Sequence, residues 1–237
     1  MGQGNAEMVI RAIVFDIGGV LELDVIELVD IGLDARWERR LGLQPGELDQ
    51  RMEPVWRAGS LGECAEEDVH QEMGKRLDMS QEQVEEYMHE MWDWYCGRLN
   101  VPMADFFRSL RPRYQTAILS NRFVGARREE QQRYQFEEMC DLIIYTHEEG
   151  IAKPDPRVYA LTCKRLGVQP TEVVFLDDLE ANVVAAREFG IHAVLFQETA
   201  QAIADIQAVL WLIMPDRSTA KPSTEECSHE SSRMTHV

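Results

Sequence analysis

The sequence predicts an α/β fold, in which helices wrap a parallel β-sheet and a separate helical segment follows the first strand. From residue 99 onward, short apolar segments alternate with helical patterns, which is typical of a parallel sheet. The first apolar segment, residues 10–15, runs into Asp16 and a pair of glycines, as the opening strand of such a sheet usually does. Residues 22–98 differ in composition and show no strand pattern.

Five segments have the length and apolar character of buried strands. In chain order they are residues 10–15, 115–119, 141–145, 172–176 and 191–196. We expect helices at residues 102–111, at 124–139, from Asp155 to Gly167, up to Gly190, and at 198–213. Asp155 and Pro156 suit the start of a helix, and Gly167 and Gly190 suit helix ends.

Residues 22–98 are predicted to form four consecutive helices, over residues 30–42, 45–58, 65–78 and 80–96. Pro45 suits a helix start, and Ser80 with Gln83 has the pattern of a capping box. The segment holds 20 acidic and 8 basic residues, so two thirds of the net charge of −18 lies in it. This shift indicates a helical subdomain, with four large side chains expected to pack its interior: Met88, Met91, Trp92 and Trp94.

The chain of 237 residues suits one large domain with an insert. We expect residues 1–21 and 99–214 to form the core and residues 22–98 to form the inserted helical segment. Residues 215–237 are rich in Ser, Thr, Glu and Lys and have few apolar side chains. They are therefore predicted to be a disordered tail.

Composition argues against several partners and locations. The chain has 42 acidic and 24 basic residues, which leaves no basic face for a nucleic acid or an anionic membrane. No apolar run approaches the roughly 18 residues of a membrane span, and residues 1–8 lack the pattern of a secretory signal. The five cysteines show no CxxC spacing, so we expect reduced thiols in a cytoplasmic protein.

Residues with suitable chemistry follow the predicted strands. Ligands of parallel sheets bind outside the carboxyl ends of the strands. The residues at or near those ends are Asp16, Gly18 and Gly19 after the first strand, Ser120 and Asn121 after the second, Lys153 after the third, and Asp177 and Asp178 after the fourth. Each of these has an ordinary explanation as a turn, cap or loop residue, but their shared position at one sheet edge favours a common function.

These residue types suit the transfer of a phosphoryl group. Asp16 is a carboxylate on a rigid strand end and can act as a nucleophile, and glycines after it allow backbone N–H groups to surround an anion. Asp16 and Asp178 offer the hard oxygen ligands that Mg²⁺ prefers. Ser120 and Lys153 can donate a hydrogen bond and a positive charge to the transferred group.

The chain resembles the haloacid dehalogenase superfamily of hydrolases, in the subgroup with a helical cap after the first strand. Four motifs carry the resemblance, which spans residues 10–196: residues 15–21 (FDIGGVL), 119–121 (LSN), 150–155 (GIAKPD) and 175–178 (FLDD) followed by Asn182. The resemblance implies a Rossmann-like three-layer core, a four-helix cap over the site, Mg²⁺ dependence and an aspartyl-phosphate intermediate on Asp16. It also implies Mg²⁺ ligands from Asp16, Asp178 and the carbonyl of Gly18, with Asp177 and Asn182 beside or behind them.

One position departs from the family pattern. Phosphatases of this family usually carry a second Asp two residues after the nucleophile, where this chain has Gly18. That Asp protonates the leaving group, and losing a positioned acid typically costs about 10²–10⁴ in rate. Glu22 and Asp24 are the nearby carboxylates considered as substitutes, although both also suit the start of the cap linker. Arg122 is expected either to meet a substrate anion or to lie in water, and His147 to lie in a solvated loop.

The leading hypothesis is a Mg²⁺-dependent phosphomonoester hydrolase that acts on a small phosphorylated metabolite. In this reading Asp16, Ser120 and Lys153 are catalytic, and Gly18, Gly19, Ser120, Asn121 and Lys153 contact the substrate. A haloacid-type dehalogenase and a non-catalytic protein that keeps the fold remain as alternatives. The sequence predicts neither the substrate nor the oligomeric state.

Overall fold

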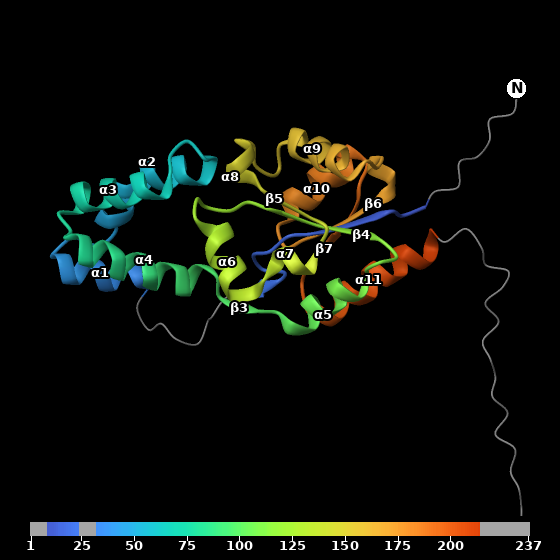
Figure 1. Ribbon diagram of the computed structural model, residues 1–237, viewed down its shortest axis with the longest axis horizontal. Coiled ribbons are helices and arrows are strands. Elements are labelled where there is room, and N and C mark those ends of the chain that lie inside the picture. The colour runs from blue at the N-terminus through green and yellow to red at the C-terminus, as the bar shows by residue number, and fades with distance from the viewer. Residues whose placement is uncertain (1–8, 24–31, 214–237) are drawn as a thin grey trace, which may run out of the picture.

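A five-stranded parallel sheet lies at the centre of the protein, in a computed structural model that describes residues 9–23 and 32–213 (Figure 1). The strand order is β5-β4-β1-β6-β7, and all four neighbouring pairs are parallel. The strands are β1 (Ala12–Phe15), β4 (Gln115–Ser120), β5 (Leu142–Tyr145), β6 (Val173–Asp177) and β7 (His192–Leu195). The chain builds outward from β1 in one direction and then in the other, so the strand order reverses beside β1, where α/β sheets bind ligands.

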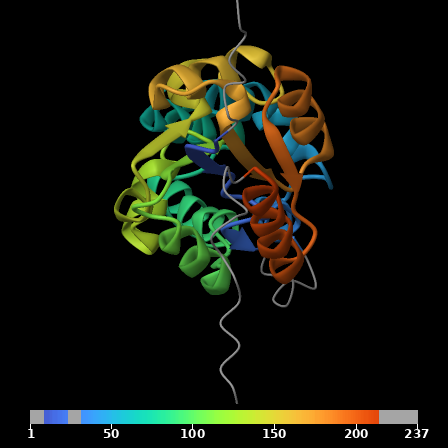
Figure 2. The same cartoon turned by 90° about the vertical axis from the view of Figure 1, so that its right-hand side faces the viewer.

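Helices cover both faces of the sheet, as the views in Figures 1 and 2 show. Alternate residues of β1 point to opposite layers, because side chains alternate along a strand. Ile13 and Phe15 join one apolar core, while Ala12 and Val14 join the other. The first layer contains α5 (Val101–Ser109), α6 (Ala126–Tyr134), α7 (Phe136–Met139) and α11 (Thr199–Leu212); the second contains α9 (Pro156–Leu166) and α10 (Glu180–Phe189).

Four helices between β1 and β4 pack on one another and lie at one end of the sheet (Figure 1). They are α1 (Leu33–Leu41), α2 (Glu47–Leu61), α3 (Glu66–Leu77) and α4 (Gln81–Tyr95), called here the four-helix lobe. Apolar side chains from all four helices are buried between them, among them Trp37, Met52, Val69 and Met88. The predicted α/β fold with an inserted group of four helices is therefore confirmed.

A short two-stranded ribbon joins the lobe to the sheet. Its strands, β2 (Glu22–Leu23) and β3 (Arg98–Leu99), pair antiparallel where the chain enters and leaves the lobe. Asn100 follows β3, and its amide Nδ2 donates to the carbonyl of Val20 at 2.9 Å. The segments that enter and leave the lobe are thus hydrogen-bonded to each other. The sequence pattern did not predict this ribbon, because strands of two residues have no periodicity to read.

Most predicted elements form within a few residues of their expected bounds, and three predictions are wrong. The helix expected over residues 124–139 is divided into α6 and α7 at Gln135, whose φ of 56° ends the first helix. His147 lies buried in a short helix, α8 (Thr146–Glu149), and not in a solvated loop. Trp94 is 62% exposed, although Trp92 and Met88 are buried as expected. Asp24 and the predicted tail, residues 215–237, lie outside the described residues.

Capping predictions are confirmed in detail. The Ser80 side chain accepts from the backbone N–H of Gln83, and the Gln83 side chain accepts from the backbone N–H of Ser80, which completes the capping box at α4. Asp155 caps α9 by accepting from the backbone N–H of Arg157 at 2.9 Å. These contacts satisfy N–H groups that a helix start leaves without partners.

The lobe meets the core where α2 packs against the segment after β4. A Cβ atom at Gly59 would lie 2.2 Å from a ring carbon of Phe123, so no side chain fits there. The backbone N–H of Val124 also donates to the carbonyl of Gly59 at 3.2 Å. Gly59 therefore allows the close approach of α2 to the core.

We predict that Gly59→Ala destabilises the protein, although alanine is normally the better helix residue. Overpacking against Phe123 should lower the free energy of unfolding by about 1–3 kcal/mol. Gly74→Ala in α3 is the matched control, because a Cβ there meets only ordinary contacts, at 3.4 Å and beyond. It should raise the free energy of unfolding by about 0.5–1 kcal/mol. Urea unfolding of both variants measures this, and a gain of stability in Gly59→Ala would contradict the packing described.

Candidate active site

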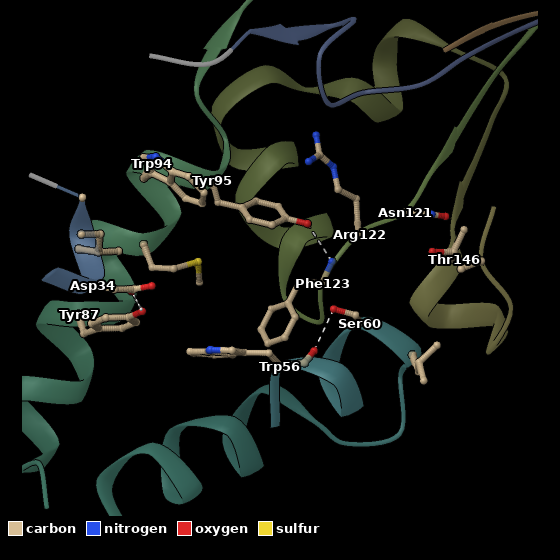
Figure 3. Close-up of a pocket in the computed structure, with 15 residues that line it drawn as sticks. Asp34, Trp56, Ser60, Tyr87, Trp94, Tyr95, Asn121, Arg122, Phe123 and Thr146 are labelled. Carbon is tan, nitrogen blue, oxygen red and sulfur yellow. Dashed lines mark hydrogen bonds between the residues drawn. The ribbon is translucent and has the colours of Figure 1, made fainter. Parts of the chain in front are cut away.

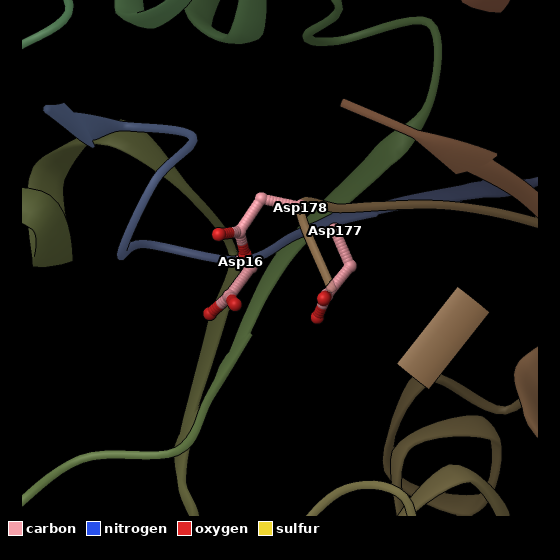
Figure 4. Close-up of side chains that lie close together, drawn as sticks. All are labelled: Asp16, Asp177 and Asp178. Carbon is pink, nitrogen blue, oxygen red and sulfur yellow. The ribbon is translucent and has the colours of Figure 1, made fainter. Parts of the chain in front are cut away.

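Three carboxylates gather at the carboxyl edge of the sheet (Figure 4). Asp16 follows β1, Asp177 ends β6, and Asp178 comes next in the chain. One oxygen from each lies within 4.8 Å of the others. Asp16 and Asp177 are buried, and Asp178 is partly buried. The prediction that these three residues meet at one sheet edge agrees with the structure.

Lys153 links the cluster. Its ammonium group lies 2.8 Å from Oδ2 of Asp16 and 2.6 Å from Oδ2 of Asp177, and the side chain is fully buried. Two carboxylates that would otherwise repel each other thus share one cation. A buried charge is tolerated when it is paired in this way.

Asp16 is held as a carboxylate with a fixed orientation. Its Oδ1 accepts from the Ser120 hydroxyl at 2.6 Å and from the backbone N–H of Ile17 at 2.7 Å. Burial alone would raise the pKa of Asp16, but the charge and hydrogen bonds of Lys153 and Ser120 outweigh burial and lower this pKa below its ordinary value. An ionised, oriented carboxylate is the form required of a nucleophile.

The other two carboxylates retain unbalanced negative charge. Burial, followed by repulsion from Asp16, raises the pKa of Asp177 above its ordinary value. Burial and the charges of Asp16 and Asp177 raise the pKa of Asp178 to about 6. Three acidic groups around one lysine suit a divalent cation, since hard carboxylate oxygens are its preferred ligands. The residues present therefore fit a magnesium ion.

Asp177 and Lys153 are positioned by neighbouring polar groups. Asn182 donates from Nδ2 to Asp177 at 3.0 Å, and the backbone N–H of Leu179 donates to the same carboxylate at 2.9 Å. Asn121 accepts from the backbone N–H of Lys153 at 2.9 Å and donates to its carbonyl at 3.0 Å. Asn121, expected as a substrate contact, thus uses its amide to fix the Lys153 loop.

The two glycines after Asp16 differ in their surroundings. Gly19 has a φ of 70°, and a Cβ there would lie 2.3 Å from Oδ2 of Asp178, so the position excludes a side chain. A Cβ at Gly18 would lie 3.3 Å from Nη1 of Arg122, the nearest atom to it. The place that a side chain at position 18 would occupy is therefore next to the guanidinium group of Arg122.

Arg122 belongs to a buried ion cluster that the sequence did not reveal. Its guanidinium pairs with Glu22 through Nη2 and with Glu130 through Nε, the latter at 2.7 Å, and it lies over the ring of Tyr95. All three residues are buried, so Arg122 does not lie in water. Burial raises the pKa of Glu22 to about 9, although Arg122 opposes that shift. Glu22 is therefore a member of this cluster, and its carboxyl group accepts a hydrogen bond from the Arg122 guanidinium.

A cavity of about 510 Å³ lies between the four-helix lobe and the core (Figure 3). Aromatic side chains make up much of its wall: Trp56, Tyr87, Trp94, Tyr95 and Phe123. Its lining also includes Asn121 and Ala152, which are chain neighbours of Ser120 and Lys153. The cavity therefore reaches the loops that carry Ser120 and Lys153.

A comparison of the chain with models of known protein families identifies its family. The sequence model of haloacid dehalogenase-like hydrolases matches residues 10–190. The chain belongs to this family. The resemblance predicted from the four motifs is thus confirmed, and the protein is a haloacid dehalogenase-like hydrolase.

Several characterised proteins are similar over most of this chain. The mouse acyl-CoA dehydrogenase family member 10 is 29% identical over 84% of this chain and 19% of its own length, and the pig bifunctional epoxide hydrolase 2 is 29% identical over 85% and 39%. The chain therefore spans less than two fifths of these longer relatives. A D-ribitol-5-phosphate phosphatase from Bacteroides thetaiotaomicron is 25% identical over 76% of this chain and 89% of its own length.

Solved structures share the fold. A haloacid dehalogenase-like hydrolase from Porphyromonas gingivalis superposes with a TM-score of 0.66 at 23% identity, over 85% of this chain and 98% of its own. A family enzyme from Bacteroides thetaiotaomicron, solved with magnesium and inorganic phosphate, gives a TM-score of 0.64 at 19% identity, over 79% and 94%. At such identities the likeness is one of fold.

We predict that Lys153→Met strongly destabilises the metal-free protein. The substitution keeps the length of the side chain but leaves Asp16 and Asp177 buried without a cation, which should cost about 3–5 kcal/mol of unfolding free energy. Lys75→Met is the control, because Lys75 is 75% exposed, and its effect should stay within about 0.5 kcal/mol. Unfolding in EDTA measures both, and equal stabilities would contradict the pairing assigned to Lys153.

Proposed function

We propose that the protein is a Mg²⁺-dependent phosphomonoester hydrolase that acts on a small phosphorylated metabolite. The observation that carries the proposal is the state of Asp16, a buried carboxylate kept ionised by Lys153 and oriented by Ser120. The similarity to a D-ribitol-5-phosphate phosphatase and the fold shared with a magnesium- and phosphate-bound enzyme support it.

In the proposed reaction an oxygen of Asp16 attacks the phosphorus atom while the bond from phosphorus to the leaving oxygen breaks. The products of this step are an aspartyl-phosphate on Asp16 and the leaving group as an alkoxide or phenolate, which then takes a proton from water. Water then attacks the phosphorus, which frees phosphate and restores the carboxylate. Ser120 and Lys153, which contact Asp16, stabilise the charge on the transferred oxygens.

Asp16, Asp178 and the carbonyl of Gly18 are the proposed metal ligands, with Asp177 and Asn182 behind them. A bound Mg²⁺ reduces the repulsion between an attacking carboxylate and a phosphate dianion. Gly18, Gly19, Ser120 and Lys153 are the proposed contacts of the phosphoryl group.

The four-helix lobe is proposed as a cap over the site, with residues 22–98 as the cap and residues 1–21 and 99–214 as the core. The wall of the cavity between them supports this division. We also propose a cytoplasmic location and no nucleic-acid or membrane partner, because the chain is strongly acidic. The four cysteines within the described residues are free thiols, and no described helix is long and apolar enough to cross a membrane.

Two alternatives are less well supported. A dehalogenase would attack a carbon atom with the same Asp16 and needs no metal, so it gives no reason for Asp178 to lie against Asp16 and Asp177. A non-catalytic protein would gain nothing from holding three carboxylates within 4.8 Å, because such like charges oppose folding. Gly18 is the best support for this second alternative.

We predict that Asp16→Asn abolishes hydrolysis of p-nitrophenyl phosphate, by at least about 10³-fold, because it removes the nucleophile and keeps the shape of the side chain. Asp105→Asn, an exposed change on α5, should leave the rate unaltered. Phosphate and nitrophenol release, assayed with Mg²⁺ and with EDTA, measures this. Chloride release from 2-chloropropionate without phosphatase activity would instead establish the dehalogenase.

We predict that Mg²⁺ stabilises the wild-type protein and has little effect on Asp178→Asn. At about 100 times its Kd, a bound ion adds about 2.7 kcal/mol of stability, which should raise the Tm by about 5–10 °C. In EDTA, Asp178→Asn should be at least as stable as wild type, because one clustered negative charge is lost. Thermal unfolding with and without Mg²⁺ tests both points, and an equal Mg²⁺ response in the two proteins would exclude Asp178 as a ligand.

A further inference from the structure

We infer that the cavity between the four-helix lobe and the core binds the organic group of the substrate, and that this group is an uncharged aromatic ring. The inference rests on the proposed function and specifies its substrate class. Four features carry it: the position of the cavity, its aromatic wall, the pairing of its charged and polar groups, and the surroundings of Gly18.

The cavity is placed to receive the organic group of a phosphomonoester whose phosphoryl group lies at Asp16. Asn121 and Ala152 line it, and they are bonded in the chain to Ser120 and Lys153, whose side chains contact Asp16. Asp16 itself is not among the lining residues. A phosphoryl group at Asp16 therefore places its ester oxygen toward the cavity and its organic group inside it.

The wall of the cavity offers flat apolar surfaces (Figure 3). Trp56 stacks on Tyr87 with centroids 6.4 Å apart and meets Phe123 edge-on at 5.8 Å. Trp94 lies on the same wall and is 62% exposed. A large exposed aromatic side chain that lines a cavity gains most when another ring covers it, since rings favour offset and edge-to-face contacts.

The charged groups that line the cavity already have partners. Of the fifteen lining residues, Arg122 is the one cation and Asp34 the one anion. Arg122 pairs with Glu22 and Glu130, and Asp34 accepts from the Tyr87 hydroxyl at 2.8 Å. A second phosphate or a carboxylate on the substrate would find no unpaired cation among the described lining residues and would lose its hydration.

Most polar side chains on the wall are engaged as well. Ser60 donates to the carbonyl of Trp56, the Tyr95 hydroxyl accepts from the backbone N–H of Phe123, and Asn121 holds Lys153. The Thr146 hydroxyl is buried and has no partner among the described residues. A sugar with several hydroxyl groups would therefore leave many hydrogen bonds unmade, which disfavours its binding.

The surroundings of Gly18 independently favour an aryl ester. Position 18 carries no acid, and the group nearest to a Cβ there is the guanidinium of Arg122. Without a proton donor, a leaving oxygen departs faster when it is a weak base, and a phenolate is a far weaker base than an alkoxide. An aromatic ring bonded directly to the ester oxygen fits the aromatic wall of the cavity. It also makes the leaving oxygen a weak base, which needs no proton from position 18.

The first experiment compares kcat/KM for four esters. Benzyl, cyclohexylmethyl and ethyl phosphate release alcohols of similar basicity, so their differences report on the cavity alone. We expect benzyl phosphate to exceed ethyl phosphate by about tenfold or more, as expected for an added buried ring, and cyclohexylmethyl phosphate to lie between them. Phenyl phosphate should exceed benzyl phosphate through kcat, because only its leaving group is less basic.

The second experiment uses variants. Trp94→Ala should lower the benzyl-to-ethyl ratio of kcat/KM by about fivefold or more, mainly through KM, and Trp94→Phe should restore most of it. Trp94 is exposed, so its loss does not open the core. Trp211→Ala is the matched control, because Trp211 is also 62% exposed but lies on α11, outside the cavity. Its ratio should equal that of the wild type.

Binding of phosphonates separates this inference from the proposed function. Benzylphosphonate and ethylphosphonate cannot be hydrolysed, and calorimetry in the presence of Mg²⁺ measures their affinities directly. A benzyl preference that Trp94→Ala reduces supports the inference even if no ester turns over, in which case the proposed function fails. Ester hydrolysis that requires Asp16 but shows equal benzyl and ethyl constants, or a ratio unchanged in Trp94→Ala, overturns the inference and leaves the proposed function in place.

Discussion

The contact of Lys153 with Asp16 and Asp177 is the interaction on which the site depends. Three carboxylates lie within 4.8 Å of one another, and this one buried cation lies 2.8 Å and 2.6 Å from two of them. Remove its charge, and either the cluster must take up protons or the sheet edge must open, since unpaired buried charges are costly. Asn121 holds the backbone of Lys153 on both sides, so the position of the cation depends in turn on the loop after β4.

The sequence predicted the members of this cluster because topology alone brings them together. Parallel strands end on the same edge, so Asp16, Ser120 and Asp177 meet there without any knowledge of side-chain packing. The helix caps at Ser80 and Asp155 were equally predictable, because capping is local in the chain. What the sequence could identify is therefore either local or imposed by the order of the strands.

The remaining features arise from contacts between residues far apart in the chain. Arg122 pairs with Glu22, 100 residues away, and no periodicity marks such a pair. Trp94 is of a residue type that is usually buried. Its position on α4 instead places it at the cavity between lobe and core, where it is 62% exposed. His147 was assigned to a loop because a helix of four residues, α8, is too short to give a pattern.

The Arg122 cluster also gives position 18 a physical context. Arg122 already has two acidic partners, Glu22 and Glu130, and all three groups are buried, so the cluster carries one more negative than positive group when fully ionised. A third carboxylate, at position 18, would start 3.3 Å from the same guanidinium and would compete for it. Such a carboxylate would add a third acidic group around one guanidinium, in a cluster where burial already raises the pKa of Glu22 to about 9. The absence of a side chain at Gly18 is therefore consistent with the presence of Arg122, and it is the basis of the proposed preference for a leaving group of low basicity.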